Sequence, residues 1–342
     1  MRFFSLSSIL FSIALASAVV HHPSSYEHEN HRVVNFVHPG ALHSSTDIER
    51  IKLRVNNKDE PWYTAYQHLS TGTLAQATWK PTPQTVLVRG APDPSTNLTQ
   101  NYGYAYRDAH SAYQLTLRWL ITTNTTFADA AVKILNAWGS TLTSINGNED
   151  RMLAAGLYGY QFANAAELLR IYPGWHKDDQ DVFAKMLTTV FVPNNYLFLT
   201  EHNGKPDFYY ANWDLCNIAS LMAIGIYTDN STMYNWAVDL FLNGLPDPSI
   251  VVNGALPYFS IANFTESGSK KTLMEIQESG RDQGHATLCV ALLGVIGQQG
   301  GNQGIDLYGA FRNQILNGYV LLPPPMTRYF GGRVEVSPNM AS

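Results

Sequence analysis

Apolar residues recur along this chain with a helical period, and the segments that carry the period are of two kinds. They lie at about residues 45–55, 62–69, 103–122, 126–143, 150–171, 178–191, 211–228, 231–243, 283–298 and 304–320. Some, such as 211–228 and 283–298, are apolar and rich in small residues on every side, which predicts helices buried all round. Others keep one polar face, which predicts helices at a surface.

Polar-faced and apolar helices alternate, and this alternation predicts an all-α fold, an (α/α)n toroid of six or seven helical hairpins. The apolar helices would form a parallel inner layer whose polar N-terminal ends gather at one end of the ring. Residues 72–101 and 245–275 are expected to be long surface loops, with weak strand signals at 84–89 and 249–255. Because the chain stops soon after the prolines at 323–325, we expect the ring to be incomplete at its C-terminus.

The chain has 342 residues, of which 45% are hydrophobic, enough for one large core. Residues 1–18 have the charge, apolar stretch and small-residue end of a cleaved signal peptide, so we expect a secreted, extracellular protein. Residues 19–36 are polar and histidine-rich and are expected to form a flexible leader, which leaves 37–342 as a single domain. Four acceptor sequons predict glycosylation at Asn97, Asn124, Asn230 and Asn263.

Charge and composition narrow the partners. The formal charge is −5 and basic residues do not cluster, which argues against a nucleic-acid partner. After the signal, no segment is apolar for long enough to span a bilayer, so we expect no membrane partner and a soluble monomer. Aromatic residues make up 12% of the chain, with 19 tyrosines, which fits either a sugar-binding cleft or a large helical core. No metal or other cofactor is expected.

The most polar helix entrance is Glu278-Ser279-Gly280-Arg281-Asp282-Gln283-Gly284-His285, directly before an apolar run. Acid, base and hydrogen-bonding groups anchored to a buried helix suggest a preorganised site. The structural alternative is an N-cap, in which Ser279 or Asp282 satisfies free backbone amides and His285 is a hydrogen-bonded core histidine.

A second entrance, Ala211-Asn212-Trp213-Asp214, leads into the apolar run at 215–226. Cys216 follows Asn212 by four residues and Cys289 follows His285 by four, so each cysteine shares a helix face with a polar residue one turn earlier. If the two helices are parallel neighbours, Asn212 and His285 lie at the same level, and a Cys216–Cys289 disulfide would hold them there. The alternative is two buried free thiols.

These segments resemble the alginate-lyase superfamily, and within it polysaccharide lyase family thirty-eight. The blocks that carry the resemblance lie at residues 38–43, 104–108, 211–213, 278–285 and 302–309. The resemblance implies a helical toroid and metal-independent β-elimination on an acidic polysaccharide, a 1,4-linked polyuronate such as glucuronan or mannuronate-rich alginate. Related lyases often have Asn-His where this chain has Asn212-Trp213. Either His285 supplies the imidazole from the neighbouring helix, or the mechanism does without it.

Elimination removes the C5 proton of a uronate and expels the oxygen at C4, which requires donors that neutralise the carboxylate. Asn212, His285 and Arg281 are the candidate donors. A tyrosine is a suitable base because its conjugate acid can protonate the leaving oxygen. Tyr258 is the candidate base, and its rivals are Tyr308, Tyr210 and Tyr106.

The remaining candidates concern substrate binding. Arg107 and His110, with Tyr106 on the same helix, could hold neighbouring uronates, or they could form a solvated face in which Arg107 pairs with Asp108. Trp213 is expected to stack on a sugar ring, with core packing as the alternative. Glu278 is expected to orient Arg281 or His285.

Two other classes stay open. A glycoside hydrolase on the same toroid would need two carboxylates across the scissile bond, and Asp214 and Asp282 at the two helix entrances could form such a pair. A non-catalytic carbohydrate-binding protein is the second alternative.

Overall fold

The computed structural model describes residues 32–33, 35–93, 97–206, 208–245, 260–265, 268, 272–318, 329–330 and 333–334. The chain divides into two units, residues 1–31 and 32–342, and every described residue belongs to the second. The predicted signal peptide and most of the predicted leader therefore lie outside the described residues.

Packing of the chain begins inside the segment expected to be leader. Val33 is buried and its backbone N–H donates to Asn235 at 2.9 Å, while the Phe36 ring meets Tyr234 edge-on at 5.3 Å. A polar network then holds His38, whose Nδ1 lies 2.7 Å from Glu167 and whose Nε2 lies 2.8 Å from Asp229.

Arg170 lies 3.1 Å from Glu167 and 3.2 Å from Asp229, and it completes this network. Burial acts to lower the pKa of His38, but the hydrogen bond and charge of Glu167 and the bond from Asp229 outweigh it, and the pKa is raised. The ring is thus held in a setting that favours its charged form.

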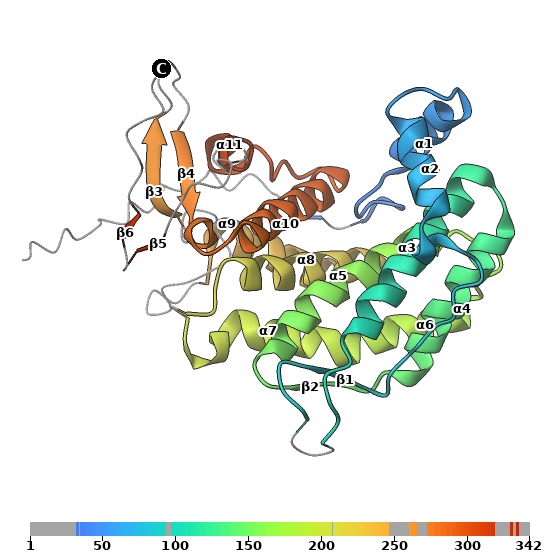
Figure 1. The fold of residues 1–342 in the computed structure, drawn as a ribbon, viewed down its shortest axis with the longest axis horizontal. Helices are drawn as coiled ribbons and strands as arrows, with labels where there is room; N and C mark the ends of the chain where they lie inside the picture. The colour runs from blue at the N-terminus through green and yellow to red at the C-terminus, as the bar shows by residue number, and fades with distance from the viewer. Residues whose placement is uncertain are drawn as a thin grey trace, which may run out of the picture. The chain divides into compact units, whose positions relative to one another are not determined.

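Helices make up most of the described chain (Figure 1). They are α1 Ser45–Asn56, α2 Trp62–Thr71, α3 Gly103–Thr122, α4 Thr125–Thr141, α5 Asp150–Leu169, α6 Lys177–Met186, α7 Val192–Glu201, α8 Asn212–Tyr227, α9 Ser231–Asn243, α10 Gln283–Asn302 and α11 Ala310–Gly318. Most bounds agree with the hydrophobic period, but α7 was missed and α11 begins later than expected. Within the described residues, no helix is both long and apolar enough to cross a membrane.

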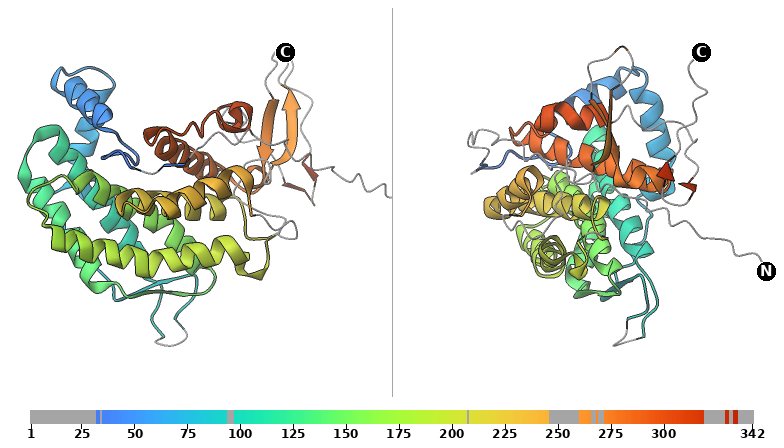
Figure 2. Two further views of the ribbon diagram at one scale, coloured as in Figure 1. Left: turned by 180° about the vertical axis from the view of Figure 1, so that it is seen from behind. Right: turned by 90° about the vertical axis from the view of Figure 1, so that its left-hand side faces the viewer.

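The helices form an inner and an outer layer, as in an α/α toroid, which confirms the predicted fold class. Helices α3, α5, α8 and α10 pack side by side, and α4, α6, α7 and α9 cover them from outside (Figures 1 and 2). Small residues allow α5 and α8 to approach closely: a Cβ on Gly156 would lie 2.3 Å from the Cys216 sulfur, and one on Gly159 would lie 2.1 Å from the Ser220 hydroxyl. Since both pairs occur in the same order, α5 and α8 are parallel.

Short strands join the described helices. β1 (Val86–Arg89) pairs in parallel with β2 (Ser144–Gly147), which confirms the strand signal at 84–89. β3 (Ser260–Thr265) and β4 (Thr272–Ile276) form an antiparallel hairpin, and β5 (Tyr329–Phe330) pairs with β6 (Arg333–Val334). The prediction that 245–275 is all loop was therefore wrong for β3 and β4. Residues 249–255 lie outside the described chain.

Three of the predicted glycosylation sites lie at the surface. Asn97, Asn124 and Asn230 are exposed, and the last two accept backbone hydrogen bonds as N-caps of α4 and α9. The side chain of Asn263 lies outside the described residues. Use of the sequons stays a prediction.

Candidate active site

Asn212 opens α8 and follows a residue with an unusual backbone conformation. Ala211 is fully buried and has φ of 56° and ψ of −110°, a combination that favours glycine and costs about 1–3 kcal/mol for other residues. Asn212 is 2% exposed, and among the described residues its Oδ1 has no hydrogen-bond partner. Buried polar atoms are normally paired, so an unpaired amide beside a strained residue marks a candidate site.

At the α10 entrance, the capping interpretation and the site interpretation both describe the geometry. Asp282 caps the helix, since its Oδ1 accepts from the His285 backbone N–H at 2.8 Å. Its Oδ2 lies 2.6 Å from the His285 Nδ1, and these two contacts lower the pKa of Asp282. The His285 side chain is still 37% exposed and that of Arg281 is 57% exposed, so both reach solvent.

Glu278 lies behind Arg281 in the 3-10 turn η5 (Gln277–Gly280), with its Oε2 3.7 Å from the Arg281 NH1. Glu278 is 2% exposed, and burial raises its pKa although the charges of Arg281 and His285 oppose the shift. A buried carboxylate in this position can restrict the directions that the guanidinium takes.

The two entrances lie next to each other, because α8 packs against α10. The backbone of Asn212 lies close to the thiol of Cys289; burial raises the pKa of that thiol to about 12, and the nearby Asn212 N–H opposes the shift. Cys289, rather than His285, is therefore level with Asn212. The prediction that Asn212 and His285 share one level was wrong: His285 lies one helical turn nearer the N-terminal end of α10.

The predicted disulfide was also wrong. Cys216 and Cys289 are both buried free thiols. The Cys216 sulfur faces the position of Gly156 on α5, whereas Cys289 faces the first residue of α8. The spacing along each helix placed the cysteines near the same end of the layer but did not determine which neighbouring helix each one faces.

A buried hydrogen-bonded pair that includes Asp214 of α8 was missed by the sequence analysis. His202 follows α7 with a left-handed φ of 47°, and its Nε2 lies 2.7 Å from the Asp214 Oδ1. Both side chains are 1% exposed. Only the αL-prone sequence His202-Asn203-Gly204 hinted at this turn, and nothing in the sequence linked it to Asp214. Because Asp214 is buried and paired, it does not reach a bound sugar as a hydrolase carboxylate would.

The candidate tyrosines differ in how free their hydroxyls are. Tyr258 lies outside the described residues. Tyr308 is half-buried and its hydroxyl donates to the carbonyl of Gly294 at 2.9 Å, which occupies the group that a base must use. Tyr106 is half-buried, and Tyr210 already interacts with another group of the protein. Among the rivals, Tyr308 is the one whose geometry argues most directly against the role of base.

The predicted substrate-binding residues on α3 lie together. Arg107 and His110 are exposed, the Arg107 guanidinium lies 5.7 Å from the Tyr106 ring centre, and the ring centres of His110 and Tyr106 are 6.1 Å apart. The proposed pairing of Arg107 with Asp108 was wrong. Asp108 is buried and accepts the indole N–H groups of Trp79 and Trp138.

Trp213 lies in an aromatic cluster at the start of α8. Its ring centre lies 5.5 Å from that of Phe198 and 4.9 Å from that of Tyr209, and the residue is only partly exposed. The packing alternative for Trp213 is therefore present in the structure, and stacking on a sugar stays a prediction. Phe208, beside Tyr209, is the aromatic of this group that is mostly exposed, at 69%.

Comparisons with known proteins identify the family and the fold. The family model of alginate lyases matches residues 54–322. The chain belongs to the alginate lyase family. By that membership it is a polysaccharide lyase. No curated protein sequence is similar enough to match it.

Solved structures share the fold of this alginate lyase family member. Alginate lyase A1-III from Sphingomonas species A1 is similar with a TM-score of 0.55 at 14% identity, covering 81% of this chain and 75% of that one. An alginate lyase from Bacteroides ovatus gives a TM-score of 0.53 at 12% identity, covering 80% and 79%. A Tyr-to-Phe variant of A1-III, solved with a tetrasaccharide, gives 0.52 at 13% identity and covers 79% and 74%.

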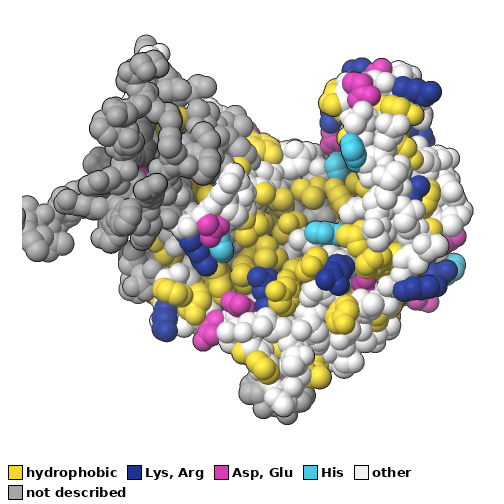
Figure 3. Space-filling model, viewed as in Figure 1, with side chains coloured by type: hydrophobic (Ala, Val, Ile, Leu, Met, Phe, Trp, Pro, Cys, Tyr) yellow, Lys and Arg dark blue, Asp and Glu magenta, His cyan; other side chains and the backbone are white. Residues whose placement is uncertain are grey.

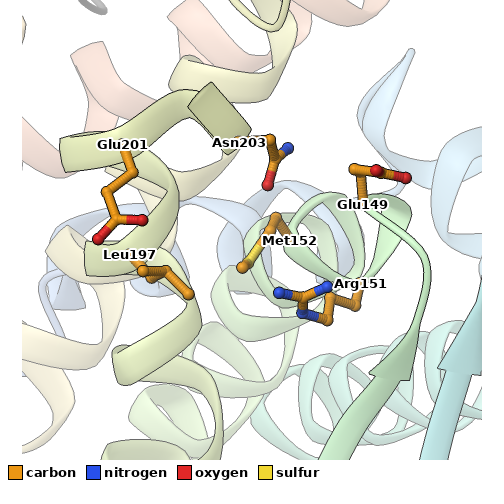
Figure 4. Close-up of a pocket in the computed structure, with 6 residues that line it drawn as sticks. All are labelled: Glu149, Arg151, Met152, Leu197, Glu201 and Asn203. Carbon is orange, nitrogen blue, oxygen red and sulfur yellow. The ribbon is translucent and has the colours of Figure 1, made fainter. Parts of the chain in front are cut away.

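The described part of this family member has a hollowed face and a pocket. Figure 3 shows a hollowed face with hydrophobic side chains on its floor and scattered histidine and basic side chains. A pocket of about 240 Å³ lies between the start of α5 and the end of α7 (Figure 4); it is lined by Glu149, Arg151, Met152, Leu197, Glu201 and Asn203. The charged groups of its lining are the carboxylates of Glu149 and Glu201 and the guanidinium of Arg151.

Proposed function

We propose that this chain cleaves 1,4-linked polyuronates, glucuronan or mannuronate-rich alginate, by β-elimination. The observation that carries the proposal is the meeting of the two helix entrances in a member of the alginate lyase family. Asn212 begins one inner helix, and Arg281 and His285 begin its neighbour. Amide, guanidinium and imidazole donors thereby lie at one end of the inner layer.

In the proposed reaction, these donors neutralise the carboxylate at C5 and make the C5 proton acidic. A base removes that proton, the C4–O bond breaks, and the electron pair forms the C4–C5 double bond. The leaving oxygen takes a proton, so the products are a new reducing end and an unsaturated uronate. Stabilising the charge that develops on the carboxylate is the largest task for the protein.

Each donor has a distinct setting in this proposal. Asn212 is buried with an unpaired Oδ1, and its amide nitrogen is the group that would donate to the carboxylate. Arg281 is exposed and backed by the buried Glu278, which suits a cation that must turn toward a bound uronate. His285 is held by Asp282 at Nδ1, which leaves Nε2 for the substrate.

We propose Tyr258 as the base and acid. A tyrosine of ordinary pKa, about 10, can lose its proton beside cations and then protonate the leaving oxygen. In glucuronate and mannuronate the C5 hydrogen and the C4 oxygen lie on the same side, so one tyrosine can serve both steps. Guluronate requires groups on opposite faces. A single tyrosine therefore favours glucuronan or polymannuronate over polyguluronate.

The test is a substrate panel of glucuronan, polymannuronate, polyguluronate and chondroitin, followed by ultraviolet absorbance of the unsaturated product. The proposal expects turnover of glucuronan or polymannuronate and little of polyguluronate. Tyr258→Phe deletes only the hydroxyl, and we expect it to abolish turnover while oligosaccharide binding persists. Tyr308→Phe is the matched control and should stay active, because the Tyr308 hydroxyl already bonds to Gly294. Binding without turnover by the wild-type chain would instead support a carbohydrate-binding protein.

A further inference from the structure

Arg89, at the end of β1, has a cationic side chain that the account above leaves unused. Its NH1 donates to the Tyr158 hydroxyl at 2.9 Å, and within the described chain this is the one hydrogen bond that the side chain makes. The residue is half-buried and, among the described residues, makes no ion pair. A guanidinium has five N–H donors, so most of those on Arg89 are available to a ligand.

The backbone around Arg89 is tightly constructed. Arg89 pairs with Gly147 across the parallel strands, and a Cβ on Gly147 would lie 2.0 Å from the Arg89 carbonyl oxygen. Gly147 has φ of 119°, and Gly90, the residue after Arg89, has φ of 90°; both values lie in the region that favours glycine. Asn101 also accepts the Val88 backbone N–H at 2.7 Å. The base of the Arg89 side chain is therefore held in one place.

Tyrosine rings fix the direction of the guanidinium. The Arg89 Cζ lies 4.9 Å from the ring centre of Tyr102 and 5.8 Å from that of Tyr158. The rings of Tyr102 and Tyr158 are nearly parallel with centres 6.4 Å apart, and Tyr106 lies 6.4 Å from Tyr158. This arrangement brings together α3, α5 and β1. Cation and aromatic rings favour each other in this geometry.

Arg89 also lies at the same end of the inner layer as Asn212. Its partner Tyr158 lies on α5 two residues after Gly156, and Gly156 faces the Cys216 sulfur. Cys216 is in the second turn of α8, four residues after Asn212, so the guanidinium approaches the α8 entrance. A polymer bound at Asn212 can therefore extend past Arg89.

We propose that Arg89, with Tyr102 and Tyr106, forms a subsite that binds the carboxylate of a uronate next to the one being cleaved. The planar guanidinium can take a carboxylate through two parallel hydrogen bonds, and the flanking tyrosines offer faces against which a sugar ring packs. This inference rests on the proposed function, and it names a specificity-determining group in the same cleft. Arg89 binds substrate here and takes no part in the proton transfers.

The test compares Arg89→Gln and Arg89→Lys with the wild-type full chain. We expect Arg89→Gln to raise KM for the cleaved polyuronate about 10-fold or more, equal to about 1.4 kcal/mol, with kcat changed less than about twofold. Arg89→Lys keeps the charge but loses the planar guanidinium, so its KM should lie between those of the wild type and Arg89→Gln. Calorimetry with polymannuronate or glucuronan tetrasaccharides, in an Asn212→Ala background that stops turnover, should show the same order of affinities.

Two controls separate a binding role from a structural one. Carboxyl-reduced tetrasaccharides should bind the Arg89→Gln variant as they bind its parent, because the interaction with the carboxylate is already gone. Arg54→Gln also removes a guanidinium from an aromatic ring, that of Trp62 at 5.3 Å, and should leave KM unchanged.

The inference is overturned if Arg89→Gln and Arg89→Lys cleave and bind polyuronates like the wild type, or if Arg89→Gln weakens charged and reduced sugars equally. Failure of the wild-type chain itself to cleave or bind any polyuronate would instead refute the proposed function. The two failures are therefore distinguishable.

Discussion

The close approach of α5 to α8 predicts that Gly156→Ala damages both stability and turnover. An added Cβ would lie 2.3 Å from the Cys216 sulfur and 2.9 Å from both the Asn217 nitrogen and the Cys216 carbonyl carbon. Two of these three neighbours are backbone atoms, which cannot move aside by rotation of a side chain. Helix α8 must therefore shift away from α5.

The magnitude follows from two opposing effects. Overpacking a well-filled core costs about 1–3 kcal/mol, and occasionally more. Replacing glycine by alanine within a helix stabilises the helix by about 1 kcal/mol, which offsets part of this cost. Because the contacts involve backbone, we expect a value near the upper end of the range and a net loss of about 2 kcal/mol in the free energy of unfolding. A shift of about 1 Å at a catalytic group can also lower turnover by about 10²-fold, and Asn212 lies one turn from the contact.

Denaturant titration measures the loss of stability, and initial rates on the cleaved polyuronate measure the loss of turnover. Gly301→Ala is the matched control, since it is also a helical glycine but a Cβ there meets nothing within 4 Å. Its stability should be unchanged or slightly higher. If Gly156→Ala unfolds at the wild-type denaturant concentration and retains full turnover, the helix spacing does not limit the site as argued here.

Three further predictions follow from the site and its surroundings. Asn212→Ala and His285→Ala should each lower kcat about 10²-fold or more without loss of fold, and an effect confined to KM would contradict the roles assigned. Since the folded pKa of His38 is raised, the stability that the charged ring contributes is complete below its unfolded pKa of about 6.5 and is lost as the pH rises through the folded pKa. The melting temperature of the wild type should therefore fall relative to that of His38→Gln as the pH rises through this range, and melting temperatures that change in parallel with pH would refute the assignment. Cys216 and Cys289 should both react with an alkylating agent after unfolding without reductant, whereas a disulfide-linked peptide would overturn their assignment as free thiols.

The hydrophobic period was enough to predict most of the helical layer, because burial on one face or all round is a local signal. Residues 231–243 form α9 with the predicted bounds. Helix α7 was missed because Pro193 lies two residues after the predicted segment at 178–191, and proline normally ends a helix. Here Pro193 occupies the first turn of α7, where a missing N–H is tolerated, after a π-helical turn at Leu187–Phe191.

The lateral contacts of the site could not be predicted in the same way. Helical spacing indicated correctly that Asn212 and the α10 entrance lie close together. It could not determine the rotation of each helix, so Cys216 was assigned to α10 although it faces α5. His202 and Arg89 acquire their partners, Asp214 and Tyr158, only through the tertiary fold.

The most direct test of the central claim is to digest polymannuronate and glucuronan with the full chain in oxygen-labelled water and to measure the masses of the oligosaccharide products by mass spectrometry. The account predicts products that carry a C4–C5 double bond, absorb in the ultraviolet and contain no oxygen from the solvent. Saturated products that each contain one solvent oxygen would show hydrolysis and would contradict β-elimination.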